Sequence, residues 1–103
     1  MTSQNRTPIP NSLNEHWMPF TDNKSFKKNP RLITEAKGVY LTNHQGKKMI
    51  DASSGLFCNP LGRGRKEITE AVSKQLDKLD YCQPFNQGYG GSFELATRIA
   101  KKT

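Results

Sequence analysis

The apolar periodicity between Arg65 and Leu79 limits most strongly what this sequence can fold into. Apolar side chains recur there at spacings of three and four, and charged side chains fill the positions between them. This pattern predicts an amphipathic helix, and such a helix is stable only when its apolar face packs against another element. The apolar positions are Ile68, Ala71, Val72, Leu76 and Leu79.

The rest of the chain has few apolar residues that could pack against that face. Its 103 residues allow one domain at most, and only 33% of them are apolar. A second helix is predicted with Ser92 as its N-cap, carrying Leu95 and Ile99 on one face. It runs into Lys102 and Thr103 without a residue that typically ends a helix. We therefore expect the sequence to stop within an incomplete domain.

Between residues 32 and 51 the residue pattern changes from that of a helix to that of strands. Strands are predicted at Leu32–Glu35, Gly38–Thr42 and Lys48–Asp51. The turn-forming residues Asn43–Gly46 join the last two strands as a hairpin. The predicted class is therefore an α+β segment, consisting of a small antiparallel hairpin unit and helices.

The N-terminal residues are predicted to contain a tail and one short helix. Residues 1–10 are polar with two prolines and form a flexible tail, and residues 11–103 form the structured part. Ser12 and Glu15 match a capping box, which predicts a helix that ends before Pro19.

The charge of the chain does not by itself identify a partner. The formal net charge is +7, but the basic residues are dispersed as doublets and triplets with acidic residues between most of them. This arrangement is typical of a solvated surface. No nucleic-acid-binding motif accompanies the charge, so we expect no nucleic acid as a partner.

The cellular location follows from what the sequence lacks. Two cysteines 24 positions apart cannot build a disulfide scaffold, which fits a reducing compartment and a cytoplasmic location. No apolar run approaches the roughly 18 residues of a membrane span, so we expect no membrane association. No apolar signal segment follows the N-terminus.

The sequence has no specific motif for a zinc site, a nucleophilic cysteine or a phosphate-binding loop. His16, His44, Cys58 and Cys82 lack the local spacing of a zinc site, and neither cysteine has the signature of a nucleophile. The glycine-rich segments at 62–64 and 88–92 precede helices, whose N-termini bind anions. Neither completes a phosphate-binding motif, and both are predicted to be turns that need positive φ.

Large apolar residues in irregular segments are the remaining signal. Phe20, Leu56, Phe57 and Phe85 all lie in predicted loops. They either pack under these loops onto the core, or they line an apolar pocket or a subunit interface. Periodicity does not distinguish the two.

The order and spacing of several short motifs give the chain a family resemblance. It resembles the N-terminal part of the class III (subgroup II) aminotransferases, and within them the omega-amino acid–pyruvate transaminases. The motifs that carry the resemblance are His16-Trp17-Met18-Pro19-Phe20-Thr21, Asn29-Pro30-Arg31-Leu32-Ile33, Gly38-Val39-Tyr40-Leu41, Gly46-Lys47-Lys48, Asp51-Ala52-Ser53-Ser54-Gly55-Leu56, Arg65-Lys66-Glu67-Ile68, Leu79-Asp80-Tyr81 and Ser92-Phe93-Glu94-Leu95-Ala96.

The resemblance implies part of a pyridoxal 5'-phosphate (PLP) enzyme of fold type I, whose complete subunit is α/β and assembles as a homodimer or tetramer. Residues 11–103 would then belong to the small domain and lead into the large domain. The implied reaction moves an amino group from an omega-amino acid or amine to pyruvate, giving alanine. The family's Schiff-base lysine lies beyond this chain, so the 103 residues alone contain no catalytic residue and are expected to be inactive. Lys24, Lys27 and Lys28 lie in a polar run that is expected to be solvated.

The resemblance also assigns substrate-binding roles to the four loop residues. Phe20 matches an aromatic residue at the substrate entrance, and Leu56 with Phe57 matches a pair that lines the pocket. Phe85 matches an aromatic residue that reaches into the partner subunit's active site. Relatives commonly have Gly-His where this chain has Gly62-Arg63. Two alternatives remain: a noncatalytic remnant that docks on a partner subunit, and a small basic nucleic-acid-binding module.

Overall fold

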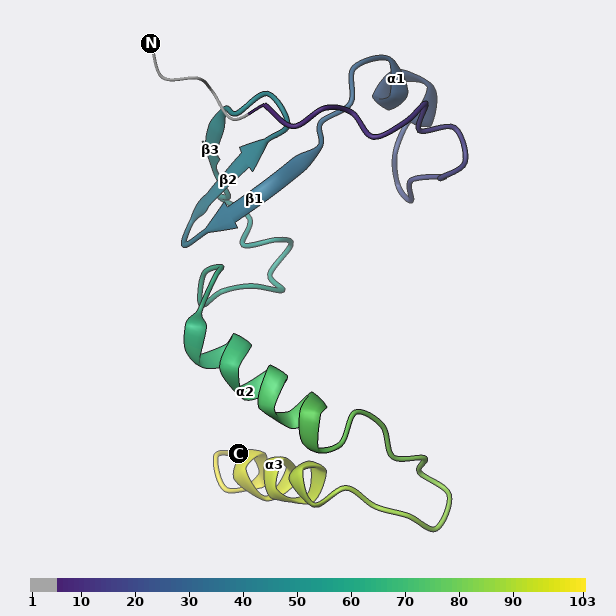
Figure 1. The fold of residues 1–103 in the computed structure, drawn as a ribbon. Helices are drawn as coiled ribbons and strands as arrows, with labels where there is room; N and C mark the ends of the chain where they lie inside the picture. Colours follow the sequence, from purple (N-terminus) through teal and green to yellow (C-terminus); the bar gives the residue numbers. More distant parts are fainter. Residues whose placement is uncertain (1–5) are drawn as a thin grey trace. The chain divides into compact units, whose positions relative to one another are not determined.

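The computed structural model describes residues 6–103 and contains a three-stranded antiparallel sheet and helices, as the α+β prediction requires (Figure 1). The chain divides into two compact units, Met1–Arg65 and Lys66–Thr103. No helix among the described residues is long and apolar enough to cross a bilayer.

The sheet of the first unit confirms the predicted hairpin. Strand β1 (Ile33–Lys37) pairs with β2 (Tyr40–Asn43), and β2 pairs with β3 (Lys48–Ile50), all antiparallel. The side chain of Asn43 closes the β2–β3 turn, because its Oδ1 accepts hydrogen bonds from the backbone N–H groups of Gln45 and Lys47, at 3.1 and 2.8 Å. This use of an Asn side chain is typical of a turn.

The prediction of a helix that starts at Ser12 is wrong. Asn11 Oδ1 accepts a hydrogen bond from the N–H of Leu13 at 2.8 Å, and Leu13 has a φ of 63°. Ser12 Oγ accepts from the N–H of Asn14 at 3.4 Å. Such local side-chain bonds offer the backbone an alternative to a helix, and here they produce a turn.

A helix that the sequence analysis missed follows instead. Helix α1 (Asn23–Lys28) begins after Asp22, whose Oδ1 accepts a hydrogen bond from the N–H of Ser25 at 3.2 Å. Its six residues are too few to produce a recognisable period. Burial in this unit centres on α1, where Asn23 is 4% exposed and Phe26 is 9% exposed.

The predicted tail is described only in part. Residues 1–5 lie outside the described residues. In the remainder, the N–H of Thr7 donates a hydrogen bond to the carbonyl of His44 at 2.9 Å, which joins this segment to the β2–β3 turn.

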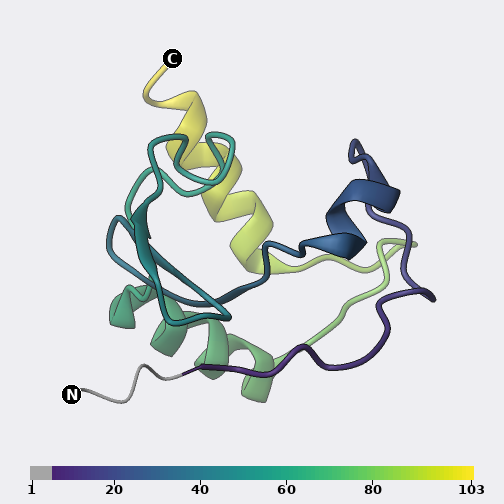
Figure 2. The same cartoon turned by 90° about the horizontal axis from the view of Figure 1, so that it is seen from above.

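The second unit contains two helices joined by an irregular connection (Figures 1 and 2). Helix α2 (Lys66–Lys78) confirms the amphipathic prediction. Helix α3 (Gly90–Ala100) starts two residues before the predicted N-cap, so the prediction for Ser92 is wrong. Ser92 lies in the first turn, and its Oγ donates to the carbonyl of Tyr89 at 2.7 Å. Neither helix has a buried residue, so their apolar faces are uncovered in this chain.

Candidate functional site

The four residues predicted to bind substrate all lie in irregular segments and are largely exposed. Phe57 is 83% exposed, and Leu56, Phe85 and Phe20 are exposed to a similar or greater extent. Leu56 and Phe57 lie in one turn of the first unit, and Phe20 lies in another turn of the same unit. Phe85 lies in the second unit. Their roles in substrate binding stay a prediction.

The turn that carries Leu56 and Phe57 has an unusual backbone. Four consecutive residues, Ser54–Phe57, have φ between 51° and 66°. We call this segment the left-handed turn. Left-handed conformation costs a residue with a side chain about 1–2 kcal/mol, so the turn needs external constraints to persist. Two constraints are backbone hydrogen bonds, from Phe57 N–H to Ser53 O and from Asn59 N–H to Ser54 O, both 2.9 Å long.

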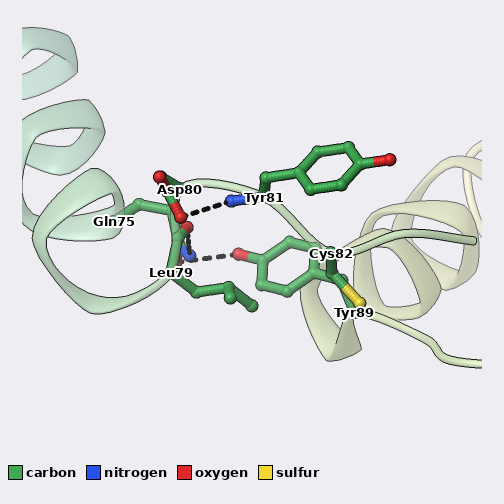
Figure 3. A pocket seen from close by; sticks show the side chains of 6 residues that line it. All are labelled: Gln75, Leu79, Asp80, Tyr81, Cys82 and Tyr89. Carbon is green, nitrogen blue, oxygen red and sulfur yellow. Dashed lines mark hydrogen bonds between the residues drawn. The ribbon is translucent and has the colours of Figure 1, made fainter.

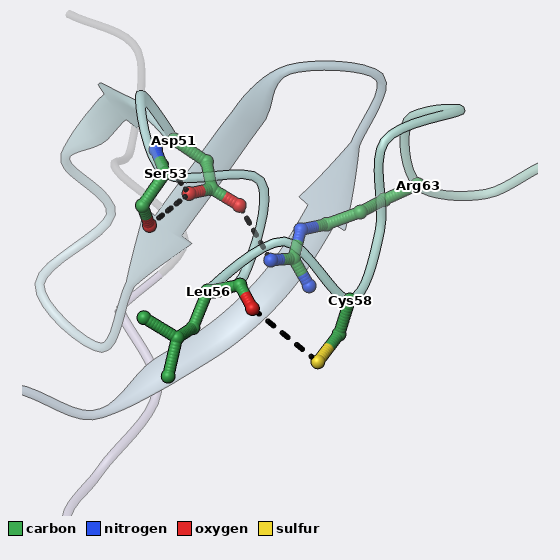
Figure 4. Close-up of polar contacts among 5 residues, drawn as sticks. All are labelled: Asp51, Ser53, Leu56, Cys58 and Arg63. Carbon is green, nitrogen blue, oxygen red and sulfur yellow. Dashed lines mark hydrogen bonds and ion pairs between the residues drawn. The ribbon is translucent and has the colours of Figure 1, made fainter.

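A charged pair provides a further constraint on this loop. Asp51 follows β3, and its Oδ2 lies 2.5 Å from Nη2 of Arg63 (Figure 4). The Asp51 side chain is 8% exposed and the Arg63 side chain 27%. Asp51 Oδ1 accepts two hydrogen bonds from Ser53, one from the hydroxyl at 3.1 Å and one from the backbone N–H at 3.3 Å.

The surroundings of Asp51 favour its ionised form. The Arg63 guanidinium contributes most, followed by the backbone N–H of Gly55, and together with Ser53 they lower the pKa of Asp51 to about 2 despite an opposing effect of burial. The carboxylate is therefore charged at neutral pH and the pair with Arg63 is ionic.

Arg63 is also fixed through its backbone. Its N–H and C=O exchange two hydrogen bonds with Gly38, both 2.9 Å long. Gly62 and Gly64 have φ of 85° and 70°, which confirms that the 62–64 segment is a turn needing positive φ. A Cβ at Gly62 would lie 3.4 Å from the carbonyl oxygen of Gly38, so this approach to the sheet also favours glycine.

The same prediction is wrong for the segment at 88–92. No positive φ occurs at Gly88, Gly90 or Gly91 in the described part of the chain. Gly90 and Gly91 begin α3, and the ring of Tyr89 occupies the position that a Cβ at Gly91 would take. The close approach of the Tyr89 side chain, and not the backbone conformation, explains why position 91 is a glycine.

The turn before α1 presents Phe20 and depends on one buried amide. Asn23 Oδ1 accepts from the N–H of Met18 at 2.8 Å, and Nδ2 donates to the carbonyls of Met18 and Thr21 at 2.9 and 3.0 Å. Phe20 has a φ of 49° and points into solvent. The three hydrogen bonds of Asn23 fix the backbone on both sides of Phe20.

The lysines of α1 are not equally solvated. Lys24 and Lys28 are exposed, as predicted. Lys27 is half-buried, and its Nζ donates to the carbonyl of Asn14 at 3.2 Å and lies 6.0 Å from the ring centroid of Trp17. Lys27 is therefore less solvated than Lys24 and Lys28.

The described lysines do not fit covalent attachment of a cofactor. Such a lysine needs an amine in a desolvated pocket. Among residues 6–103 every lysine except Lys27 is exposed, and the Lys27 amine already contacts Asn14 and Trp17. No group of three or more His, Cys, Asp or Glu side chains in this described range is placed to hold a metal ion.

The second unit contains a cavity of about 270 Å³ between the end of α2 and the start of α3 (Figure 3). The hydroxyl of Tyr89 donates to Oε1 of Gln75 at 2.9 Å, and Gln75 Nε2 donates to the carbonyl of Leu79 at 2.9 Å. The residues that line it are Gln75, Leu79, Asp80, Tyr81, Cys82 and Tyr89. Phe85 is not among them, so the cavity is separate from the predicted substrate-binding residues.

Three residues that hold these turns were not predicted from the sequence: Asn23, Asp51 and Arg63. Asp51 and Arg63 are twelve positions apart, a separation at which no periodic pattern connects two residues. Asn23 is the first residue of helix α1, which was not predicted. Arg63 stands out in the sequence only as a basic residue between two glycines, Gly62 and Gly64.

Comparison with known proteins places the chain against one part of a longer sequence. No family model matches it. It is 47% identical over 95 residues to beta-alanine–pyruvate aminotransferase of Pseudomonas aeruginosa, covering 90% of this chain and 21% of that protein. It is also 47% identical over 91 residues to omega-amino acid–pyruvate aminotransferase of Pseudomonas putida, covering 88% of this chain and 20% of that protein.

Solved structures are matched with a similar coverage. The omega-transaminase of Pseudomonas jessenii in complex with PMP superposes with a TM-score of 0.80 at 26% identity, over 85% of this chain and 20% of that chain. The adenosylmethionine-8-amino-7-oxononanoate aminotransferase of Methanocaldococcus jannaschii gives 0.79 at 34% identity, with the same coverage. The chain thus spans about one fifth of the length of the proteins it matches.

Proposed function

We propose that this chain, which matches the N-terminal fifth of omega-amino acid–pyruvate aminotransferases, forms the N-terminal part of an enzyme of that kind. The observation that carries the proposal is 47% identity across nearly the whole chain. The complete enzyme would transfer the amino group of an omega-amino acid such as beta-alanine to pyruvate, forming alanine.

The cofactor we infer is pyridoxal 5'-phosphate, which supplies an electron sink for amino-group transfer when it is bound. The described residues of this chain do not fit its attachment, so we assign that task to the other part of the complete enzyme. No step of the cofactor chemistry is assigned to this chain.

The part that we assign to this chain is the shape of the substrate pocket. Phe20 would stand at the entrance, Leu56 and Phe57 would line the pocket, and Phe85 would reach into the partner subunit's site. Apolar side chains at these places exclude water and leave room for a short aliphatic donor. Their exposure in this chain supports the proposal, since apolar surface of this extent is usually covered by another part of a protein.

We also infer that the complete enzyme is a cytoplasmic homodimer or tetramer that binds neither nucleic acid nor membrane. The uncovered apolar faces of α2 and α3 support an assembly, because an amphipathic helix obtains most of its stability from packing. Cross-linking and sedimentation of the complete enzyme would test this inference.

A chimera tests the proposed function. Residues 1–103 replace the N-terminal fifth of the Pseudomonas aeruginosa beta-alanine–pyruvate aminotransferase, and this protein is called the chimera below. We expect it to form alanine from beta-alanine and pyruvate within about tenfold of the parent's kcat/KM, a loss of roughly 1.4 kcal/mol at most. The isolated 103 residues, and the remaining four fifths alone, serve as controls and are expected to be inactive.

A folded chimera that takes up the cofactor but transfers no amino group would contradict the proposal. Binding of the isolated chain to DNA with a steep salt dependence would favour the nucleic-acid-binding alternative instead.

A further inference from the structure

We propose that the Asp51–Arg63 pair positions the left-handed turn and thereby determines how tightly the amine donor binds, an inference that rests on the function proposed above. Neither residue is placed in contact with substrate. Both are positioning residues, which act through the side chains that the turn presents. Three features of the pair support this role.

First, the pair fixes both ends of the loop. One carboxylate oxygen of Asp51 contacts Arg63, and the other accepts two hydrogen bonds from Ser53, immediately before the left-handed turn. The backbone of Arg63 is in turn bonded to Gly38 beside β1. The start of the turn and the end of the loop are therefore both attached to the sheet.

Second, the guanidinium fills the space beside the turn. A Cβ added at Gly55 would lie 2.8 Å from Nη2 of Arg63, which means that the guanidinium already packs at contact distance against the middle of the turn. Removing the guanidinium opens this space. The strained residues can then relax toward negative φ, which residues with side chains prefer.

Third, the turn alone decides where its apolar side chains point. Leu56 and Phe57 are 74% and 83% exposed, so little packing of their own holds them in this chain. A change in φ at either residue redirects its side chain. The expected consequence is weaker donor binding, with little change in the rate of the bound complex.

Steady-state kinetics of chimera variants test the inference. We expect R63M and D51N each to raise the KM for beta-alanine about tenfold while kcat stays within about twofold, because misplaced pocket groups weaken binding. R63K retains the charge but not the guanidinium, so it is expected to recover part of the loss. The double variant D51N/R63M is expected to cost no more than the larger single effect, since the two residues act as one unit.

The matched control is K47M, which removes one positive charge from an exposed lysine in the same unit. It is expected to leave KM unchanged, so a general effect of charge on KM would also appear in K47M, whereas an effect specific to the Asp51–Arg63 pair would not. Unchanged KM in R63M and D51N, with the unmutated chimera active, would overturn the positioning role and leave the proposed function intact.

A second readout does not require activity. With 4-fluorophenylalanine at position 57 of the chimera, we expect one dispersed ¹⁹F resonance. R63M should shift it toward the value of the unfolded chain, R63K should shift it less, and K47M should leave it in place. A resonance identical in the chimera and in R63M would overturn the inference even if the chimera were inactive. Inactivity alone would count only against the proposed function.

Discussion

Two turns of the first unit present predicted pocket residues at positive φ, but they are held by different chemistry. The turn at Phe20 is held by one neutral amide, Asn23, which is 4% exposed and makes three hydrogen bonds to backbone groups. The left-handed turn is held by an ionic pair that remains partly exposed. A buried neutral clamp contributes through hydrogen bonds that would otherwise be unsatisfied, whereas an ionic pair responds to pH and salt.

The largest expected effect is on the turn held by Asn23. N23A removes three hydrogen bonds and leaves the N–H and C=O of Met18 without these partners in a part-buried setting. Unsatisfied buried groups cost about 1–3 kcal/mol, so we expect the local opening free energy at Met18 to fall by roughly 2 kcal/mol. Hydrogen exchange of the Met18 amide in the chimera measures this opening free energy.

Q83A is the control for N23A, because it removes an amide side chain from an exposed position in the other unit. It should leave exchange at Met18 unchanged. Equal protection of Met18 in N23A and in the unmutated chimera would show that the amide does not hold the turn.

A smaller effect is expected from adding one methyl group to the left-handed turn. G55A places a Cβ at a residue with φ of 60° and 2.8 Å from Nη2 of Arg63, so it strains the backbone and displaces the guanidinium. We expect a loss of about 1–2 kcal/mol in the local stability of the turn, measured by exchange of the Phe57 amide.

G90A is the matched control for G55A. A Cβ there meets nothing within 4 Å, and the residue begins α3. Alanine is the better helix former, so G90A should be neutral or slightly stabilising, by up to about 1 kcal/mol. If both variants changed Phe57 exchange equally, the proposed steric role of Gly55 would be wrong.

The parts that sequence reasoning predicted correctly are those governed by local patterns. Helix α2 follows from its period, and the β2–β3 hairpin follows from turn residues such as Asn43. The Ser12 capping box failed because Asn11 and Ser12 bond to nearby N–H groups in a turn instead. A capping signal is only two residues long, and no apolar period supported the helix that it predicted.

Of the residues in the candidate site, the sequence pointed only to the exposed apolar ones. Phe20 and Phe57 are visible in the sequence because large apolar residues are unusual in polar loops. Asn23 and Arg63 are polar residues whose importance lies in contacts across the fold, with the backbone of Met18 in one case and with Asp51 in the other. Such contacts depend on tertiary structure and leave no local pattern.

The smallest expected effect concerns the pH response that distinguishes the two turns. The pKa of Asp51 is lowered from 3.8 to about 2 mainly by Arg63, so its ionised form stabilises the folded turn. That stabilisation is fully present above about pH 4 and is lost as the pH falls from 3.8 toward 2. The Asn23 side chain does not titrate, so its three hydrogen bonds contain no charge that is lost in this window. Carboxyl ¹³C NMR of the chimera should place the pKa of Asp51 near 2, and R63M should raise it toward 3.8. The same titration midpoint in both proteins would mean that the guanidinium does not stabilise the carboxylate, and the two turns would then not differ in the way proposed.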